Sequence, residues 1–189
     1  MLHSRFLDIQ IVRNGRGIVA LKPFVAGEVV TEITGSILTS DQVWNLWSSN
    51  PDAAANCFRF CDDRYLNPQN ELGAFANHSC NPNAWISKSR EQLFLRARRT
   101  IVANEEVVHD YSTLLGSDDI WRMECNCGEA NCRGVVERFD RLPSAVRRHY
   151  LATGAIPSYI LQTNRSRAGS VAGSKQSTRG ARERVSSRP

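Results

Sequence analysis

Short apolar or alternating runs, separated by residues that favour turns, fill the first two-thirds of the chain. A run that alternates with period two predicts a β-strand, because successive side chains of a strand point to opposite faces. Asn-Gly, Lys-Pro and Ala-Gly pairs separate the first of these runs, as expected for turns. The pattern predicts strands at residues 6–12, 18–21, 29–33, 57–61, 93–97 and 107–109.

Two segments have the pattern of short helices instead. Residues 40–49 place Ser40 at a capping position, and their apolar side chains recur at the spacing of one helix face. Residues 143–152 begin with Pro143 and are followed by Gly154, which suits the start and the end of a helix. No internal repeat is evident. The sequence therefore predicts a mostly β architecture with short helices.

The composition is that of a globular protein. The chain has 189 residues, of which 41% are hydrophobic and 23% charged. It contains no apolar run near the roughly 20 residues that a membrane span needs. The N-terminus lacks the apolar stretch of a signal peptide. We therefore expect a soluble, intracellular monomer (in cytoplasm, nucleus or nucleoid, or exported without a recognisable signal) that has no membrane partner.

The positive charge is concentrated at the C-terminal end. Residues 163–189 hold seven of the 24 basic and one of the 19 acidic side chains, which leaves 17 basic and 18 acidic ones in residues 1–162. This tail is rich in Ser, Gly, Ala and Arg and has almost no large apolar residues, so we expect it to be disordered. Its charge predicts binding to nucleic acid or to an acidic partner, although it lacks aromatic residues for base stacking.

Clustered cysteines indicate a metal site. Cys125, Cys127 and Cys132 lie within eight residues, a spacing that brings several thiolates to one tetrahedral Zn²⁺. Cys80 is the natural fourth ligand, since four thiolates close a structural site. Two alternatives stay open: His78 as the ligand, or a water that completes a catalytic zinc.

The other two cysteines do not fit that site. Cys57 and Cys61 are four residues apart on a predicted strand, which separates them by about 13 Å. That distance is too long for two ligands of one metal ion. We interpret both as ordinary buried or half-buried thiols.

Four motifs in one order resemble the SET-domain protein-lysine N-methyltransferases with a post-SET zinc-binding segment. Residues 77–83 (Asn-His-Ser-Cys-Asn-Pro-Asn) resemble the central motif of that family. Residues 15–18 resemble its N-terminal Gly-x-Gly, and residues 105–111 its Glu-rich strand that ends in Asp-Tyr. Residues 125–134 are similar to its post-SET cysteines and glycine. The resemblance covers roughly residues 5–136.

The resemblance implies a fold and a division of the chain. The fold would be a SET-domain β-clip-like fold with a C-terminal zinc-binding post-SET segment. Residues 1–120 would form the SET domain and residues 121–138 the post-SET segment. Residues 139–162 would be a C-terminal helical extension, followed by the basic tail at 163–189.

The resemblance also implies the chemistry. S-adenosylmethionine would bind on one face, and a protein substrate, a histone or another basic protein, would present its lysine from the other. The backbone at Arg16 and Gly17 would meet the cofactor, and Asn77 and His78 would hydrogen-bond to it. Tyr111 would contact the cofactor and orient the lysine amine.

Two departures from the family pattern affect the predicted function. His109 stands two positions before Tyr111, where many relatives have Tyr or Phe, and we expect it to influence how many methyl groups are added. Ala74 stands where an arginine is common, which leaves one partner interaction unidentified. The alternative function is a catalytically weak SET-fold module that its basic tail recruits to nucleic acid or an acidic partner.

Overall fold

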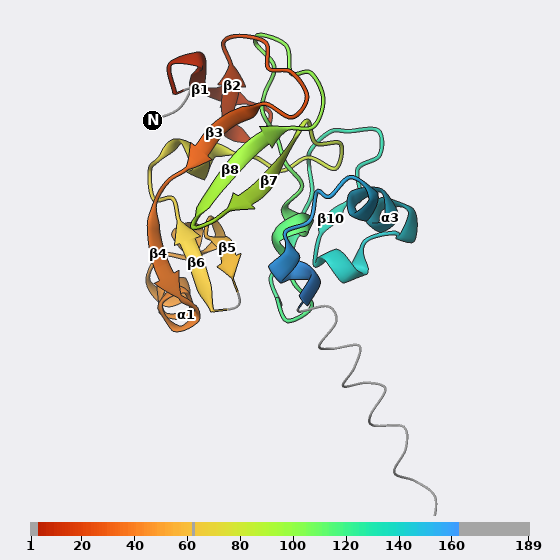
Figure 1. The fold of residues 1–189 in the computed structure, drawn as a ribbon. Helices are drawn as coiled ribbons and strands as arrows, with labels where there is room; N and C mark the ends of the chain where they lie inside the picture. The colour runs from red at the N-terminus through yellow and green to blue at the C-terminus, as the bar shows by residue number, and fades with distance from the viewer. Residues whose placement is uncertain (1–3, 62, 163–189) are drawn as a thin grey trace, which may run out of the picture.

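The computed structural model describes residues 4–61 and 63–162, and within them short strands outnumber the helices (Figure 1). The predicted mostly β architecture with few short helices is confirmed. The strands are β1 (Leu7–Val12), β2 (Gly15–Ala20), β3 (Val29–Ile33), β4 (Ser36–Thr39), β5 (Phe58–Cys61), β6 (Arg64–Asn67), β7 (Ala84–Ser89), β8 (Gln92–Ala97), β9 (Met123–Glu124) and β10 (Val135–Val136). The helices are α1 (Ser40–Ser49), α2 (Pro51–Ala55) and α3 (Ser144–Ala152), and the 3-10 helices are η1 (Ser4–Phe6), η2 (Leu72–Phe75), η3 (Tyr111–Leu114) and η4 (Phe139–Arg141).

The strands form several small antiparallel sheets. β1 and β2 make a hairpin whose register pairs Leu7 with Ala20 and Val12 with Gly15. Gly15 has a φ of 97°, a conformation that glycine adopts without steric cost. The central sheet has the order β3-β8-β7, and a second sheet has the order β4-β6-β5. β9 and β10 form a short ladder beside the cysteine cluster.

The boundaries of several predicted elements differ by one to three residues from the sequence analysis. The first strand begins at Leu7, because Phe6 belongs to η1, and the second extends from Gly15 to Ala20. Thr39, not Ser40, caps α1: its hydroxyl accepts the Gln42 N–H, and the Gln42 side chain accepts the Thr39 N–H. This reciprocal pair is a capping box.

The predicted strand at residues 107–109 is wrong. This segment is extended, but it makes only isolated bridges, with Glu106 opposite Val19 and His109 opposite His78. The Val107 N–H bonds to β2, whereas the His109 N–H bonds to the loop at Asn77, on the other side of the segment. A continuous ladder therefore has no single neighbour to form on.

The apolar side chains form one main core and two smaller clusters. The main core joins the hairpin and both three-stranded sheets, and its fully buried members include Ile18, Phe24, Val30, Phe60, Leu95 and Val107. Residues 139–161 form their own cluster and pack against Trp85 of β7. The third cluster surrounds Cys80 and Cys125. Figure 1 shows α3 and β10 on the same side of the molecule, beside β7.

No helix in residues 4–61 and 63–162 is long and apolar enough to cross a bilayer. Residues 163–189, for which we predict a disordered basic tail, lie outside the described residues.

Candidate active site and metal centre

Main-chain hydrogen bonds bring three of the sequence motifs together. The Val107 N–H donates to Ile18 O at 2.8 Å, which attaches the segment before Tyr111 to β2. On its other side, the His109 N–H donates to Asn77 O and the Ser79 N–H donates to His109 O, both at 3.0 Å. Residues far apart in the sequence thus form one site because this extended segment lies between them.

Asn77, Gly17 and Glu106 form a tight contact at the edge of the site. The Asn77 amide donates to Arg16 O at 3.0 Å and to Glu106 Oε1 at 2.8 Å. A Cβ at Gly17 would lie 2.5 Å from Glu106 Oε1 and 2.9 Å from Asn77 Nδ2, so only glycine fits. The Arg16 guanidinium lies 4.3 Å from the ring centre of Phe75. The shape of the predicted cofactor loop is therefore fixed from within the chain.

His78 connects the segment of Tyr111 to the cysteine cluster. Its Nδ1 accepts the Tyr111 N–H at 3.2 Å, and its Nε2 lies 3.4 Å from Cys80 Sγ. Because Nδ1 accepts a hydrogen bond, the neutral ring carries its proton on Nε2, facing the sulfur. Burial lowers the pKa of His78 to about 4, against the opposing effect of Asp110. A neutral His78 is therefore the form present near pH 7.

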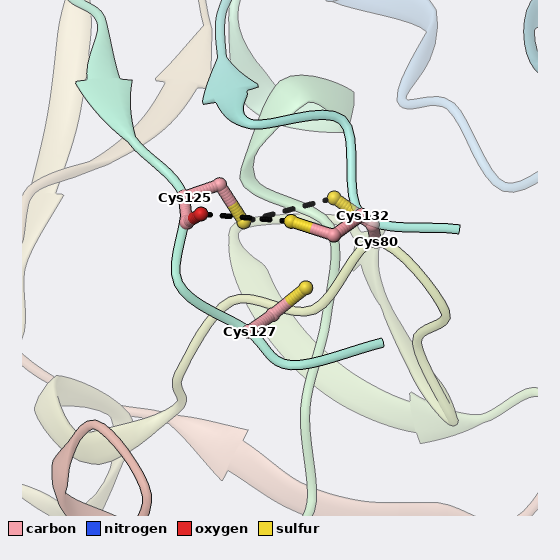
Figure 2. Close-up of side chains that lie close together, drawn as sticks. All are labelled: Cys80, Cys125, Cys127 and Cys132. Carbon is pink, nitrogen blue, oxygen red and sulfur yellow. Dashed lines mark hydrogen bonds between the residues drawn. The ribbon is translucent and has the colours of Figure 1, made fainter. Parts of the chain in front are cut away.

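The four predicted metal ligands converge. The sulfurs of Cys80, Cys125, Cys127 and Cys132 lie within 4.8 Å of one another (Figure 2). Cys80 Sγ and Cys125 Sγ are 3.7 Å apart, close to the roughly 3.8 Å that a tetrahedral site with 2.3 Å metal–sulfur bonds requires. The fourth thiol of the cluster is therefore Cys80, as predicted. His78 is not a member of the cluster and contacts the sulfur of Cys80 instead. This group of thiols has the geometry to hold a metal ion.

The chemistry of these thiols favours a cation. Burial raises the pKa of Cys80 to about 11 and also raises the pKa of Cys125. At Cys127, backbone hydrogen bonds outweigh burial and lower the pKa to about 7. Several buried thiolates are costly side by side unless a positive ion offsets their charge. Cys57 and Cys61 lie outside the cluster; Cys57 Sγ donates to Ala53 O at 3.3 Å, and Cys61 Sγ accepts from Arg64.

A buried carboxylate that the sequence analysis did not assign joins this site to the C-terminal segment. The side chain of Asp110 is 0% exposed and accepts the Tyr150 hydroxyl at 2.7 Å and the Arg133 guanidinium at 2.8 Å. It also accepts the Ser112 N–H at 3.0 Å, at the start of η3. Asp110 lies in the motif of residues 105–111, and Arg133 directly follows the last cysteine of the cluster. Tyr150 lies in α3, and no motif or spacing in the sequence marked it as part of the site.

Two cavities meet at Tyr111. One cavity of about 270 Å³ is lined by Asn77, His78 and the loop of Cys125 to Cys127. The other, of about 340 Å³, is lined by α1, the end of α2, β5 and residues 114–121, and it includes His109. Tyr111 and Trp121 line both cavities, together with Ala55 and Asn56. Arg16 and Gly17 do not line either cavity directly; they lie behind Asn77.

Both aromatic residues of the catalytic motif are neutral and enclosed. The Tyr111 hydroxyl donates to Ala76 O at 3.0 Å, and burial together with the charge of Glu106 raises the pKa of Tyr111. His109 is 1% exposed, and its ring nitrogens make no hydrogen bond of normal geometry among the described residues, although the backbone of Ala76 is close enough to act on the ring and opposes the lowering of its pKa. Burial and the nearby His78 lower the pKa of His109 to about 3. Its ring lies 4.9 Å from that of Tyr111 and stacks on Phe58.

Comparison with known proteins gives one consistent family. The family model described as SET domain matches residues 15–112, more than half of the chain. The H3 lysine-4 specific histone-lysine N-methyltransferase of Cryptococcus neoformans is 31% identical over 130 residues, 64% of this chain and 9% of that protein. Histone-lysine N-methyltransferase SETD1B of Xenopus laevis is 28% identical over 129 residues (64% and 6%). Histone-lysine N-methyltransferase ATXR7 of Arabidopsis thaliana is 28% identical over 159 residues (79% and 11%). The chain thus spans about a tenth of the length of these relatives.

We predict that Tyr150→Phe destabilises the protein by about 1–2 kcal/mol, because it leaves one lone pair of the buried Asp110 carboxylate without a donor. Chemical unfolding monitored by circular dichroism measures this loss. Tyr65→Phe is the matched control, since the Tyr65 hydroxyl makes no hydrogen bond in the part of the chain that the structure describes. Equal stability of the two variants would contradict the structural role of the Asp110 network.

Proposed function

This chain belongs to the SET-domain family, and we propose that it transfers a methyl group from S-adenosylmethionine to the side-chain amine of a lysine in another protein. The named activity of its relatives, histone-lysine methylation, supports this reaction class. Because the chain matches only a small part of those relatives, the substrate is a proposal as well: a histone or another basic protein.

The observation that carries the proposal is the pair of cavities that share Tyr111 and Trp121. Methyl transfer requires the donor and the amine to approach each other in line, from opposite sides. Two cavities with a common aromatic wall provide that arrangement.

The cavity beside the cysteine loop suits the cofactor. Its lining combines the amide side chains of Asn14, Asn56 and Asn126 with the ring of Trp121. Convergent hydrogen-bonding groups around an aromatic face are what a polar nucleoside with an amino-acid end requires. When bound, S-adenosylmethionine supplies an activated methyl group on a sulfonium.

The other cavity suits the lysine side chain. Its inner wall is formed by Phe58, His109 and Tyr111, which are buried or half-buried. The target amine must be neutral to attack, and burial disfavours its charged form. Tyr111 is held by its hydroxyl and positions the amine through its ring and oxygen, while the surrounding apolar groups exclude water. No side chain has to act as a strong base.

We infer that the metal of the cysteine cluster is Zn²⁺. Four thiolates in a tetrahedral arrangement are typical of structural zinc, and the sulfur spacing fits that geometry. The cluster packs with Tyr111, Trp121 and Val136, so the metal would hold the wall shared by the two cavities. Its role is structural, and the transfer reaction needs no step at the metal.

The division of the chain into a SET domain at 1–120, a post-SET segment at 121–138 and a helical extension at 139–162 is part of this proposal. The separate apolar cluster of residues 139–161 supports the last boundary. Recruitment to nucleic acid or an acidic partner through residues 163–189 rests on the charge of that tail alone.

The direct test is incubation of the purified chain with methyl-labelled S-adenosylmethionine and a panel of histones and cell lysate. We expect label on lysines of one or a few basic proteins, located by mass spectrometry. Tight binding of the cofactor without label on any protein would favour the alternative, a catalytically weak binding module.

The metal prediction concerns Cys80. The purified protein should contain about one zinc per chain, and Cys80→Ser should release it and also lower methyl transfer, because the shared wall loses its support. Elemental analysis measures the metal. Cys57→Ser, outside the cluster, should keep its zinc. Stoichiometric zinc in Cys80→Ser would rule out the four-thiolate site.

The chemical prediction concerns Tyr111. Tyr111→Phe keeps the ring and removes the hydroxyl, so turnover should fall by roughly 10²-fold or more while cofactor affinity stays near normal. Calorimetry measures the affinity, and transfer of label measures turnover. Near-normal turnover would mean that the active site lies elsewhere.

The third prediction concerns the number of methyl groups added. His109→Phe removes two ring nitrogens from the cavity wall, so the ratio of mono- to di- and trimethyl product should change more than the rate of the first transfer. Mass spectrometry of a lysine peptide gives the ratio. His149→Phe, on α3 and outside both cavities, should leave it unchanged. The same product ratio in His109→Phe would assign His109 a purely structural role.

A further inference from the structure

The turn of the first hairpin and the cysteine loop both line the smaller cavity. Because Val12 pairs with Gly15, the turn between β1 and β2 consists of two residues, Arg13 and Asn14. Asn14 lines the smaller cavity, and so does Asn126 of the cysteine loop. The shape of this cavity therefore depends on how the turn and the loop are placed relative to each other.

The side chain of Arg13 joins these two walls. Its Nε donates to Asn126 O at 3.1 Å, a contact between residues 113 positions apart in the chain. The guanidinium also lies against Gly128, where a Cβ would be 2.5 Å from Arg13 Cζ and 2.6 Å from Arg13 Nε. Gly128 has a φ of 78°, so glycine suits both the backbone conformation and the close approach. The carbonyl of Asn126 and the glycine at 128 thus fit the Arg13 side chain together.

Other contacts hold the opposite side of the cysteine loop. The Asn131 amide donates to Cys80 O at 3.2 Å, and the Asn81 amide donates to Glu129 Oε2 at 3.1 Å. Both contacts attach the loop to the central motif at residues 77–83, independently of the hairpin. Loss of the Arg13 contact should therefore release the part of the loop that lines the cavity and leave the cysteine cluster intact.

We propose that Arg13 is a positioning residue for the cofactor, which fixes Asn126 relative to Asn14 and so keeps the smaller cavity in the shape that the cofactor requires. Arg13 is not among the residues that line this cavity, so it acts through Asn126. A wall that is already in place does not have to be ordered when the ligand binds, and affinity gains accordingly. This inference rests on the proposed function, since it takes the smaller cavity as the cofactor cavity.

The test is binding of S-adenosylmethionine to Arg13→Gln, measured by calorimetry. We expect the affinity to fall by about three- to tenfold, the range of one hydrogen bond of modest net strength. The KM for the cofactor should rise by the same factor, while kcat at saturating cofactor and the metal content stay those of the unaltered chain. Loss of metal or of kcat would show that Arg13 supports the fold in general, and would overturn its positioning role.

Gly128→Ala tests the same contact from the loop. The added methyl group would displace the guanidinium, so this variant should also bind the cofactor more weakly. In the double variant with Arg13→Gln the displaced group is already absent, so the loss should be smaller than the product of the two single losses. Arg148→Gln, at an exposed arginine on α3 outside both cavities, is the matched control and should retain full affinity.

The outcomes separate this inference from the proposed function. Arg13→Gln with unchanged cofactor affinity would overturn the role of Arg13 and leave methyl transfer standing. Single losses that multiply in the double variant would show that Arg13 and Gly128 act independently, which also contradicts the inference. An unaltered chain that does not bind S-adenosylmethionine would overturn the proposed function and the role of Arg13 with it.

Discussion

The buried carboxylate of Asp110 determines how the parts of this protein fit together. Burying a charge is costly unless hydrogen bonds and an opposite charge compensate for it. Here the compensation comes from three directions: Arg133 from the cysteine loop, Tyr150 from α3 and the backbone of Ser112. The residue that follows Asp110 in the chain is Tyr111. The position of Tyr111, for which we propose the catalytic role, thus depends on segments that the SET-domain match, which ends at residue 112, does not include.

Strands whose buried face has a clear apolar pattern were the easiest elements to predict from the sequence. β3 and β8 fulfil this condition, since they alternate or are apolar and pair with each other in the central sheet. The sheet of β4, β6 and β5 was mostly missed, because β4 is largely exposed and β6 has only one fully buried residue. The apolar segment at 107–109 read as a strand, but its burial comes from insertion between two other segments. The hydrophobic pattern of a segment indicates that the segment is buried, but it does not indicate which other segment it packs against.

In the candidate site, too, some residues could be predicted from the sequence and others could not. Asn77, Cys80 and Tyr111 lie in motifs whose resemblance to the SET-domain family predicted that they would meet, and the structure brings Cys80 and Tyr111 together through His78. The contact from Tyr150 to Asp110 spans 40 residues, and a tyrosine in an ordinary helix has no periodicity that announces it. Trp121 likewise lies in a segment without regular structure, between the last 3-10 turn of the SET match and β9. Such contacts depend on how loops are packed, which the sequence of each loop does not encode alone.

The two ends of the cavity that we propose for the lysine differ in polarity. At one end, Asp118 and Asp119 pair with the buried Arg59. At the inner end, burial lowers the pKa of His109 to about 3 and raises the pKa of Tyr111. Both shifts have the same cause, since a dry environment disfavours whichever form of a group is charged. In the proposed reaction, an ammonium that enters this cavity is subject to that same effect, so its pKa falls as it approaches Tyr111. In the proposed reaction the proton is therefore most easily lost to water before the amine is enclosed, so that a cavity without a strong base can still present a neutral nucleophile.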